Sequence, residues 1–297
     1  MQNGNSDLIK FTYTPILGWS VSRFEKFNLC KRAYYYEYYS KYEPLELRKK
    51  VETLKKLTSI PLEQGNIVHD VIKVLLERLL KTEKAIDETR FFEFVKRKTS
   101  EYVNKKVFME VYYNYLNKIE EEQIFYEVSQ CLKNFLSSER YLWILSKAIC
   151  NKNKWLIEPP GYGETRIGNL KAYCKVDFLF PVDDEIYIID WKTGKRDEQK
   201  HRKQMLGYSL WTNFHFNKEP HKIFPIVAYI SEGYNEVSFA INEFDLEEFQ
   251  KVVEEETEQM YFMCENIEQN IPKPKEEFIR TTNEKICKNC NYQELCF

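Results

Sequence analysis

The spacing of hydrophobic residues predicts a largely helical first half of the chain. Apolar side chains recur every three or four residues from about 64 to 81 and again from about 87 to 148, which is the period of an amphipathic helix. The longer stretch predicts two long helices with a break near residues 114–118. Residues from about 20 to 40 predict a further helix, rich in tyrosines and in basic residues.

The pattern changes at Trp155, after which strands and helices follow one another. Runs of β-branched and aromatic residues separated by turn sequences predict five strands: WLIEPP at 155–160, LKAYCKVDFLF at 170–180, EIYIIDWK at 185–192, FPIVAYI at 224–230 and EVSFAI at 236–241. Helices are predicted at about 197–214 and 245–267. This order favours an α/β or α+β core behind a helical N-terminal lobe.

The composition is that of a globular protein. The 297 residues can bury a sizeable core and approach the upper limit for one domain. Hydrophobic residues make up 43% of the chain and charged residues 30%, which excludes a disordered protein. The formal net charge is −2, so any attraction to nucleic acid must be local. We expect a cytoplasmic protein with no membrane partner, because the sequence has neither a long apolar run nor a signal-peptide core.

The most informative stretch is VDFLFPVDDEIYIIDWKTGK, residues 176–195. If the chain folds back within PVDDE, Asp177 and Asp190 face each other across a hairpin, about 5 Å apart. Lys192 shares the face of Asp190, because side chains alternate along a strand. Two carboxylates and an ammonium suit Mg²⁺ with a substrate phosphate, because Mg²⁺ prefers carboxylate oxygens. The alternative interpretation is an exposed ion pair at a strand end.

The motif IDWKTGK and the motifs around it resemble the core of RecB-like PD-(D/E)xK nucleases, in the order of that family. The resemblance implies that Asp177 and Asp190 bind a metal ion and that Lys192 is the catalytic lysine. It also implies a ligand in the backbone carbonyl of Trp191. The family's helical GxxxH motif corresponds to GNIVH, which ends at His69, a further metal ligand or a residue that positions one.

The family's Q-x-x-x-Y motif corresponds to QMLGY, which makes Gln204 and Tyr208 two further catalytic candidates on one helix face. Glu158 lies where the family often carries another acidic residue. The resemblance implies a restriction-endonuclease-like α/β fold, with a central mixed β-sheet flanked by helices, and a Mg²⁺ or Mn²⁺ cofactor. We expect a single domain over residues 1–297, with 87–150 as a helical insertion or lobe that the resemblance explains least.

The eight cysteines of an intracellular chain point to metal binding or burial rather than disulfides. Three of them have the spacing C-x₂-C-x₅-C in the tail at 280–297: Cys287, Cys290 and Cys296. Cys30 is a candidate fourth ligand, and four thiolates suit either a [4Fe–4S] cluster or zinc. The pattern resembles the iron–sulfur nucleases of the AddB type and the CRISPR-associated RecB-like exonucleases, which implies a structural cluster that staples the tail. Lys31 follows Cys30 where that family typically has proline. The other cysteines are expected to be small buried hydrophobic residues: Cys131, Cys150, Cys174 and Cys264.

Basic residues near these motifs are candidate contacts to a DNA backbone: Arg23, Lys195, Arg196 and Arg202. The leading hypothesis is a metal-dependent exonuclease acting on DNA with single-stranded or free ends. Any ATP-driven unwinding must come from a partner, because the chain has no GxxxxGK[ST] motif of its own. The partners that we expect are a helicase or a CRISPR or repair protein. The alternatives are a DNA-end-binding or scaffolding subunit with little cleavage of its own, and a zinc protein without nuclease activity.

Overall fold

The computed structural model describes residues 8–159 and 163–296 of the chain. Its centre is a five-stranded sheet in the order β3-β6-β7-β8-β9. Neighbouring strands are antiparallel except β7 and β8, which run parallel and are connected by helix α9. The strands are β3 (Leu156–Ile157), β6 (Phe178–Val182), β7 (Glu185–Lys192), β8 (Ile223–Tyr229) and β9 (Asn235–Ser238).

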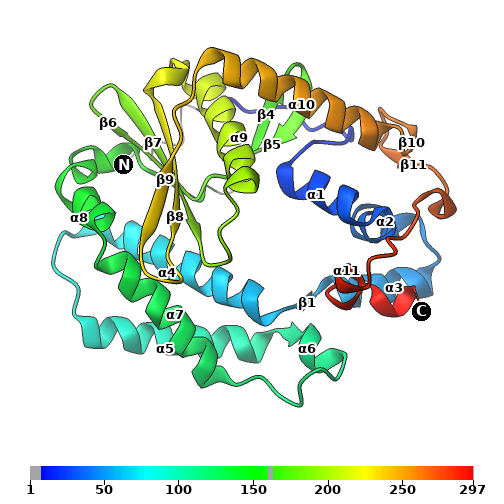
Figure 1. The fold of residues 1–297 in the computed structure, drawn as a ribbon, viewed down its shortest axis with the longest axis horizontal. Helices are drawn as coiled ribbons and strands as arrows, with labels where there is room; N and C mark the ends of the chain where they lie inside the picture. The colour runs from blue at the N-terminus through cyan, green and yellow to red at the C-terminus, as the bar shows by residue number, and fades with distance from the viewer. Residues whose placement is uncertain (1–7, 160–162, 297) are drawn as a thin grey trace.

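Helices cover both faces of this sheet (Figure 1). Ile188 packs with α9 on one face, whereas its neighbour Ile189 packs with the α4 and α7 cluster on the other, because side chains alternate along β7. Helix α5 packs outside α4 and α7. The helices concerned are α4 (Ile60–Lys81), α5 (Glu88–Lys105), α7 (Glu121–Leu136), α8 (Glu139–Ser146) and α9 (Glu198–Phe216).

A second hydrophobic cluster joins the N-terminal helices to the C-terminal part of the chain. Four tyrosines of the N-terminal region are buried in it, so they serve packing: Tyr34, Tyr35, Tyr36 and Tyr39. The helices that meet here are α1 (Val21–Leu29), α2 (Lys31–Tyr39), α3 (Leu45–Lys55) and α10 (Glu243–Tyr261), and the short α11 (Glu284–Lys288) lies in the tail. Short strand pairs complete the fold: β1 (Leu57–Thr58) with β2 (Val107–Phe108), β4 (Glu164–Ile167) with β5 (Leu170–Tyr173), and β10 (Cys264–Asn266) with β11 (Ile271–Pro272).

The predicted α/β class, with a central mixed sheet flanked by helices, is confirmed, but several element boundaries were wrong. The single helix expected over 20–40 is divided at Cys30, whose backbone is extended (φ −162°, ψ 110°). The single strand expected over 170–180 is divided into β5 and β6, because β5 pairs with β4 while β6 pairs with β3 and β7.

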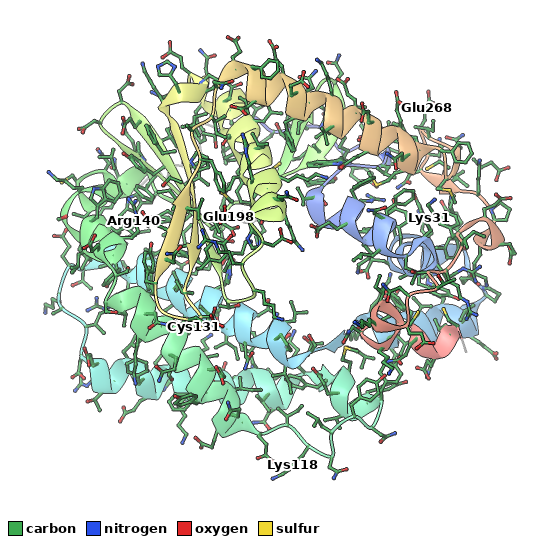
Figure 2. The ribbon with its side chains drawn as sticks, in the orientation of Figure 1. Lys31, Lys118, Cys131, Arg140, Glu198 and Glu268 are labelled. Atoms are coloured by element: carbon green, nitrogen blue, oxygen red, sulfur yellow. The ribbon has the colours of Figure 1, made fainter. Side chains whose placement is uncertain are left out.

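The region 87–148 contains more breaks than the two long helices expected there. Residues 107–108 leave the helical path to pair as β2 with β1, and the short α6 (Met109–Tyr112) follows. The break expected near residues 114–118 lies between α6 and α7, and a further break falls at Ser138, whose side chain caps α8. Cys131 is buried on α7 as expected (Figure 2), but Cys150 is exposed, because it lies in a surface 3₁₀ segment. Every helix among the described residues is too short or too polar to span a lipid bilayer.

Candidate active site

The hairpin of β6 and β7 has the register that the sequence predicted. Phe178 faces Ile189 in its last pair, and the next residues outward are Asp177 and Asp190. Asp177 Oδ2 accepts a hydrogen bond from the Trp191 backbone N–H at 3.2 Å. The two carboxylates therefore lie at the same end of the hairpin, as expected.

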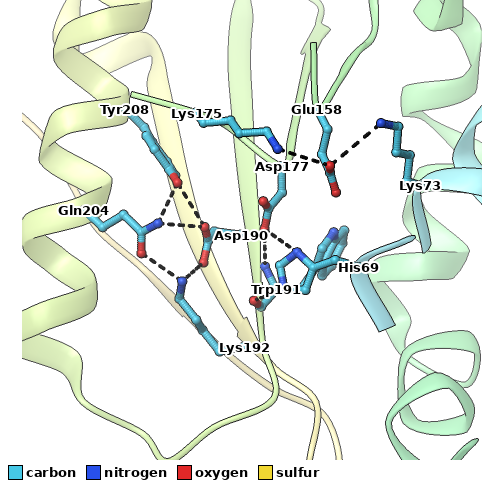
Figure 3. Close-up of polar contacts among 10 residues, drawn as sticks. All are labelled: His69, Lys73, Glu158, Lys175, Asp177, Asp190, Trp191, Lys192, Gln204 and Tyr208. Carbon is cyan, nitrogen blue, oxygen red and sulfur yellow. Dashed lines mark hydrogen bonds and ion pairs between the residues drawn. The ribbon is translucent and has the colours of Figure 1, made fainter. Parts of the chain in front are cut away.

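Asp190 is almost completely buried, with 1% of its surface exposed, and belongs to a polar network with β7 and α9 (Figure 3). Its Oδ1 accepts hydrogen bonds from Gln204 Nε2 at 3.2 Å and from the Tyr208 hydroxyl at 3.3 Å. Lys192 forms an ion pair with the same carboxylate and donates a hydrogen bond to Gln204 Oε1 at 2.8 Å. The structure thus brings these four predicted catalytic residues together, and the lysine ammonium is fixed by two partners.

His69 joins α4 to the end of the hairpin. Its Nδ1 lies 3.2 Å from Asp177 Oδ2, and its Nε2 lies 3.0 Å from the Trp191 carbonyl oxygen. The imidazole therefore lies between two oxygens that the sequence proposed as metal ligands. Gly65, one turn earlier on α4, lies close to the end of β7, where a Cβ atom would make a tight contact of 3.2 Å with Thr193 Oγ1.

Glu158 completes a compact group with His69 and Asp177. One ligand atom of each lies within 4.8 Å of the others, and no further group of three such residues was found in the described part of the chain. The Glu158 backbone has a positive φ of 36°, a conformation that side chains other than glycine rarely adopt, and its N–H donates to the Asp177 carbonyl at 2.9 Å. Such strain often marks a functional position. The family resemblance had indicated an acidic residue at Glu158 but had assigned it no function.

The two aspartates of the site have pKa values that are shifted in opposite directions. Burial raises the pKa of Asp190, and the charge of Asp177 raises it further. Burial also acts to raise the pKa of Asp177, but the charge and hydrogen bond of His69 outweigh it and leave that pKa lowered. Burial alone would lower the pKa of His69, whereas the Asp177 carboxylate raises it to about 9. Two carboxylates with so little solvent create a site at which a divalent cation is favoured.

A cleft of about 480 Å³ opens beside these ligands. Its walls come from α4, α5, the end of β7 and the segments before β4 and β6, including Pro61, Leu62, Tyr102, Lys106 and Lys175. Lys175 and Lys73 lie 3.6 and 3.8 Å from Glu158. The helical region 87–150 thus contributes directly to the cleft.

The four cysteines proposed as cluster ligands line one small apolar pocket: Cys30, Cys287, Cys290 and Cys296. The break between α1 and α2 places Cys30 there, and its sulfur accepts a hydrogen bond from the Thr281 N–H at 3.5 Å. Burial raises the pKa of the Cys290 thiol to about 11, and the other three sulfurs add to that shift. Residues from the two ends of the chain thus form one thiol-rich pocket.

Arg23 lies among tyrosines rather than facing open solvent. Its guanidinium stacks on the Tyr38 ring at 4.2 Å and donates hydrogen bonds to the Tyr34 hydroxyl at 3.2 Å and to the Gly18 carbonyl at 3.2 Å. The Arg23 guanidinium thus already has one ring contact and two hydrogen bonds within the fold.

Two of the other candidate DNA contacts also have partners in the protein. Arg196 Nε donates to Glu198 at 2.7 Å, and Arg202 pairs with Asp245 at 2.7 Å. Lys195 is exposed in the loop after β7. Of the four candidates, Lys195 is therefore the one whose charge faces solvent without a described ion pair.

The family comparison agrees with this geometry. The family profile described as "PD-(D/E)XK nuclease superfamily" matches residues 18–297. No curated protein matches the chain. Among the matching solved structures is one titled "Crystal structure of SSO0001", which is 15% identical over 63% of this chain and 77% of that chain, with a TM-score of 0.30.

Proposed function

Because the chain belongs to the PD-(D/E)XK nuclease superfamily, we propose that it hydrolyses DNA phosphodiester bonds with Mg²⁺ or Mn²⁺ at the site around Asp177 and Asp190. Membership supports a metal-dependent nuclease in general. The observation that carries the specific proposal is the convergence of His69, Glu158 and Asp177 beside the buried Asp190–Lys192 pair.

The residues present fit a hard divalent cation. One ligand atom each of Asp177, Glu158 and His69 lies within 4.8 Å of the others. The Trp191 carbonyl lies 3.0 Å from His69 Nε2, and the Asp190 carboxylate belongs to the preceding residue of β7. Such a cation would supply a coordinated water of lowered pKa and would polarise a phosphoryl oxygen. Its binding through His69 requires that ring to lose a proton.

The chain's own groups position the reacting phosphate and water. Lys192, held by Asp190 and Gln204, presents a fixed ammonium towards charge that develops on the phosphate. Burial, with the charges of Asp190 and Asp177, raises the pKa of Tyr208 well above its ordinary value. Its hydroxyl therefore stays protonated and keeps donating to Asp190, which orients that carboxylate.

We also propose that the four-cysteine pocket holds a structural [4Fe–4S] cluster, as in RecB-like iron–sulfur nucleases. All four cysteines line the same apolar pocket, and burial together with the neighbouring sulfurs raises the pKa of the Cys290 thiol. Four thiolates from both ends of a single domain over residues 1–297 would bind such a cluster.

The substrate that we propose is DNA with a single-stranded end. The cleft beside Asp177 shares Leu62 with a second cleft of about 400 Å³, which extends along α1 to the tail. Leu62 and Leu29, both in this second cleft, are 55% and 54% exposed. Exposed apolar side chains along a cleft suit unpaired bases better than a duplex, whose bases are already stacked.

The test is a substrate panel. The protein, purified without oxygen, is incubated with Mg²⁺, Mn²⁺ or EDTA and with single-stranded, double-stranded and circular DNA. We expect metal-dependent cleavage of single-stranded ends and none of circular single strands. Cleavage of circles would contradict exonuclease action. Tight DNA binding without cleavage in either metal would contradict the nuclease and favour a DNA-end-binding subunit.

A further inference from the structure

The lysines that line the active-site cleft differ in how their charges are matched. Lys175 lies 3.6 Å from Glu158. Lys106 is exposed, lines the same cleft and has no ion pair or hydrogen bond within the part of the chain that the structure describes. A cation at the wall of a cleft that gathers acidic groups, yet paired with none of them, is available to an anionic ligand.

The backbone of Lys106 is fixed relative to the metal ligands. Lys106 is the C-cap residue that follows α5, and Val107 then pairs in parallel with Leu57 in the β1–β2 ladder. Strand β1 leads directly into α4, which carries His69. Tyr102, in the last turn of α5, lines the same cleft. The lysine is therefore presented by a rigid segment and not by a free loop.

We propose, on the basis of the nuclease function above, that Lys106 binds a phosphate of the DNA strand in the cleft beside the scissile position. A lysine ammonium binds phosphate as a point charge and needs no particular orientation of the strand. The helical region 87–150, which the family resemblance explains least, thereby supplies part of the DNA-binding surface. Arg23, Arg196 and Arg202 already have partners within the fold.

Lys105 provides a matched control for this proposal. It is the adjacent residue, carries the same charge and has 73% of its side chain exposed. Its Nζ lies 3.9 Å from Glu101, on its own helix, and it does not line the cleft. A general loss of positive charge would affect both variants alike, whereas a phosphate contact in the cleft would affect only Lys106.

The experiment measures binding of a fluorescent single-stranded DNA by anisotropy, in EDTA to prevent cleavage, over a range of salt concentrations. We expect Lys106→Ala to weaken binding about tenfold at low salt and to reduce the slope of log Kd against log salt by about 0.7, the value for one phosphate contact to a single strand. Lys106→Arg and Lys105→Ala should bind as the wild type does. Equal effects of Lys105→Ala and Lys106→Ala, or no effect of either, would overturn the proposal.

Steady-state cleavage separates this inference from the nuclease assignment. Lys106→Ala should raise KM and leave kcat unchanged, because the contact is made before and during the reaction alike. Cleavage by the wild type with unchanged KM in Lys106→Ala would refute the phosphate contact alone. Lys106-dependent binding without any cleavage would refute the nuclease alone, and a wild type that binds no DNA would refute both.

Discussion

The imidazole Nδ1 of His69 lies 3.2 Å from Oδ2 of Asp177, which joins helix α4 to the first residue before strand β6. The second ring nitrogen lies 3.0 Å from the Trp191 carbonyl. One side chain thus ties a helix of the first half of the chain to both strands of the hairpin. The contact defines where the candidate metal ligands meet.

This contact gives His69 an unusual titration. In the metal-free protein the pKa of His69 is raised to about 9, because the charge of Asp177 outweighs the effect of burial. The pKa of His201, lowered chiefly by burial, is about 4. NMR of the ring protons in EDTA should show one histidine titrating near each of these values. A His69 resonance, identified by its loss in His69→Gln, that titrates near 6.5 would contradict the ion pair.

The stability of the metal-free protein should follow from the same shift. The folded pKa of His69 lies above the unfolded value of about 6.5. The contribution of His69 to the free energy of unfolding is therefore fully present below about pH 6.5 and is lost as the pH rises through about 9. Urea unfolding in EDTA should show His69→Gln less stable than the wild type at pH 6, with a smaller difference near pH 9.5. A difference independent of pH would count against this linkage.

Gln204 should affect the reaction rate without affecting the fold. It bridges Lys192 and Asp190, and hydrogen bonds to charged groups contribute about 1.5–3 kcal/mol. Gln204→Ala should therefore lower kcat about 10- to 100-fold, with little change in KM or in melting temperature. Gln199→Ala, at an exposed position of the same helix, is the control. Equal kcat values for the two variants would exclude a positioning role for Gln204.

Gly65 should be required for the approach of α4 to β7. A Cβ atom would be 3.2 Å from Thr193 Oγ1, and a branched side chain would reach further. Gly65→Val should displace His69 and weaken Mn²⁺ binding measured by calorimetry, although valine suits a helix better than glycine does. The double variant Gly65→Ala/Thr193→Ala should bind Mn²⁺ nearly as the wild type does. Full Mn²⁺ affinity in Gly65→Val would show that the close packing is not needed.

The cysteine pocket should couple cofactor content to stability. Cys290→Ser should lose the broad visible absorbance of an iron–sulfur cluster and lower the melting temperature by roughly 10 °C, because the cluster would bind both ends of the fold. Cys150→Ser, at an exposed cysteine outside the pocket, should change neither property. If the wild type contains one zinc ion per chain and has no visible absorbance, the pocket is a zinc site and the cluster proposal is contradicted.

Local geometry explains what the sequence could predict. The turn sequence and the alternation of side chains were sufficient to pair Asp177 with Asp190 and to place Lys192 on the same face, and the β6–β7 register agrees. The four-residue spacing of Gln204 and Tyr208 likewise put both on one face of α9. These predictions depend on neighbours along the chain or across one tight hairpin.

The remaining features depend on contacts between distant segments. Glu158 reaches Asp177 through a residue with positive φ after a two-residue strand, which hydrophobic patterns cannot reveal. Lys106 reaches the cleft because β1 and β2, about 50 residues apart along the chain, pair in parallel. Arg202 is neutralised by Asp245 on α10, a partner that its local sequence does not show.

The most direct test of the central claim is cleavage of end-labelled single-stranded DNA by Asp190→Ala and Lys192→Ala. Asp184→Ala and Lys222→Ala are matched controls, because that ion pair lies at the opposite end of the β6–β7 hairpin. The cleavage rate of both active-site variants should fall by more than about 100-fold, with folding and cofactor content unchanged. The control variants should cleave at the wild-type rate. Activity of either active-site variant within about tenfold of the wild type would contradict the assignment.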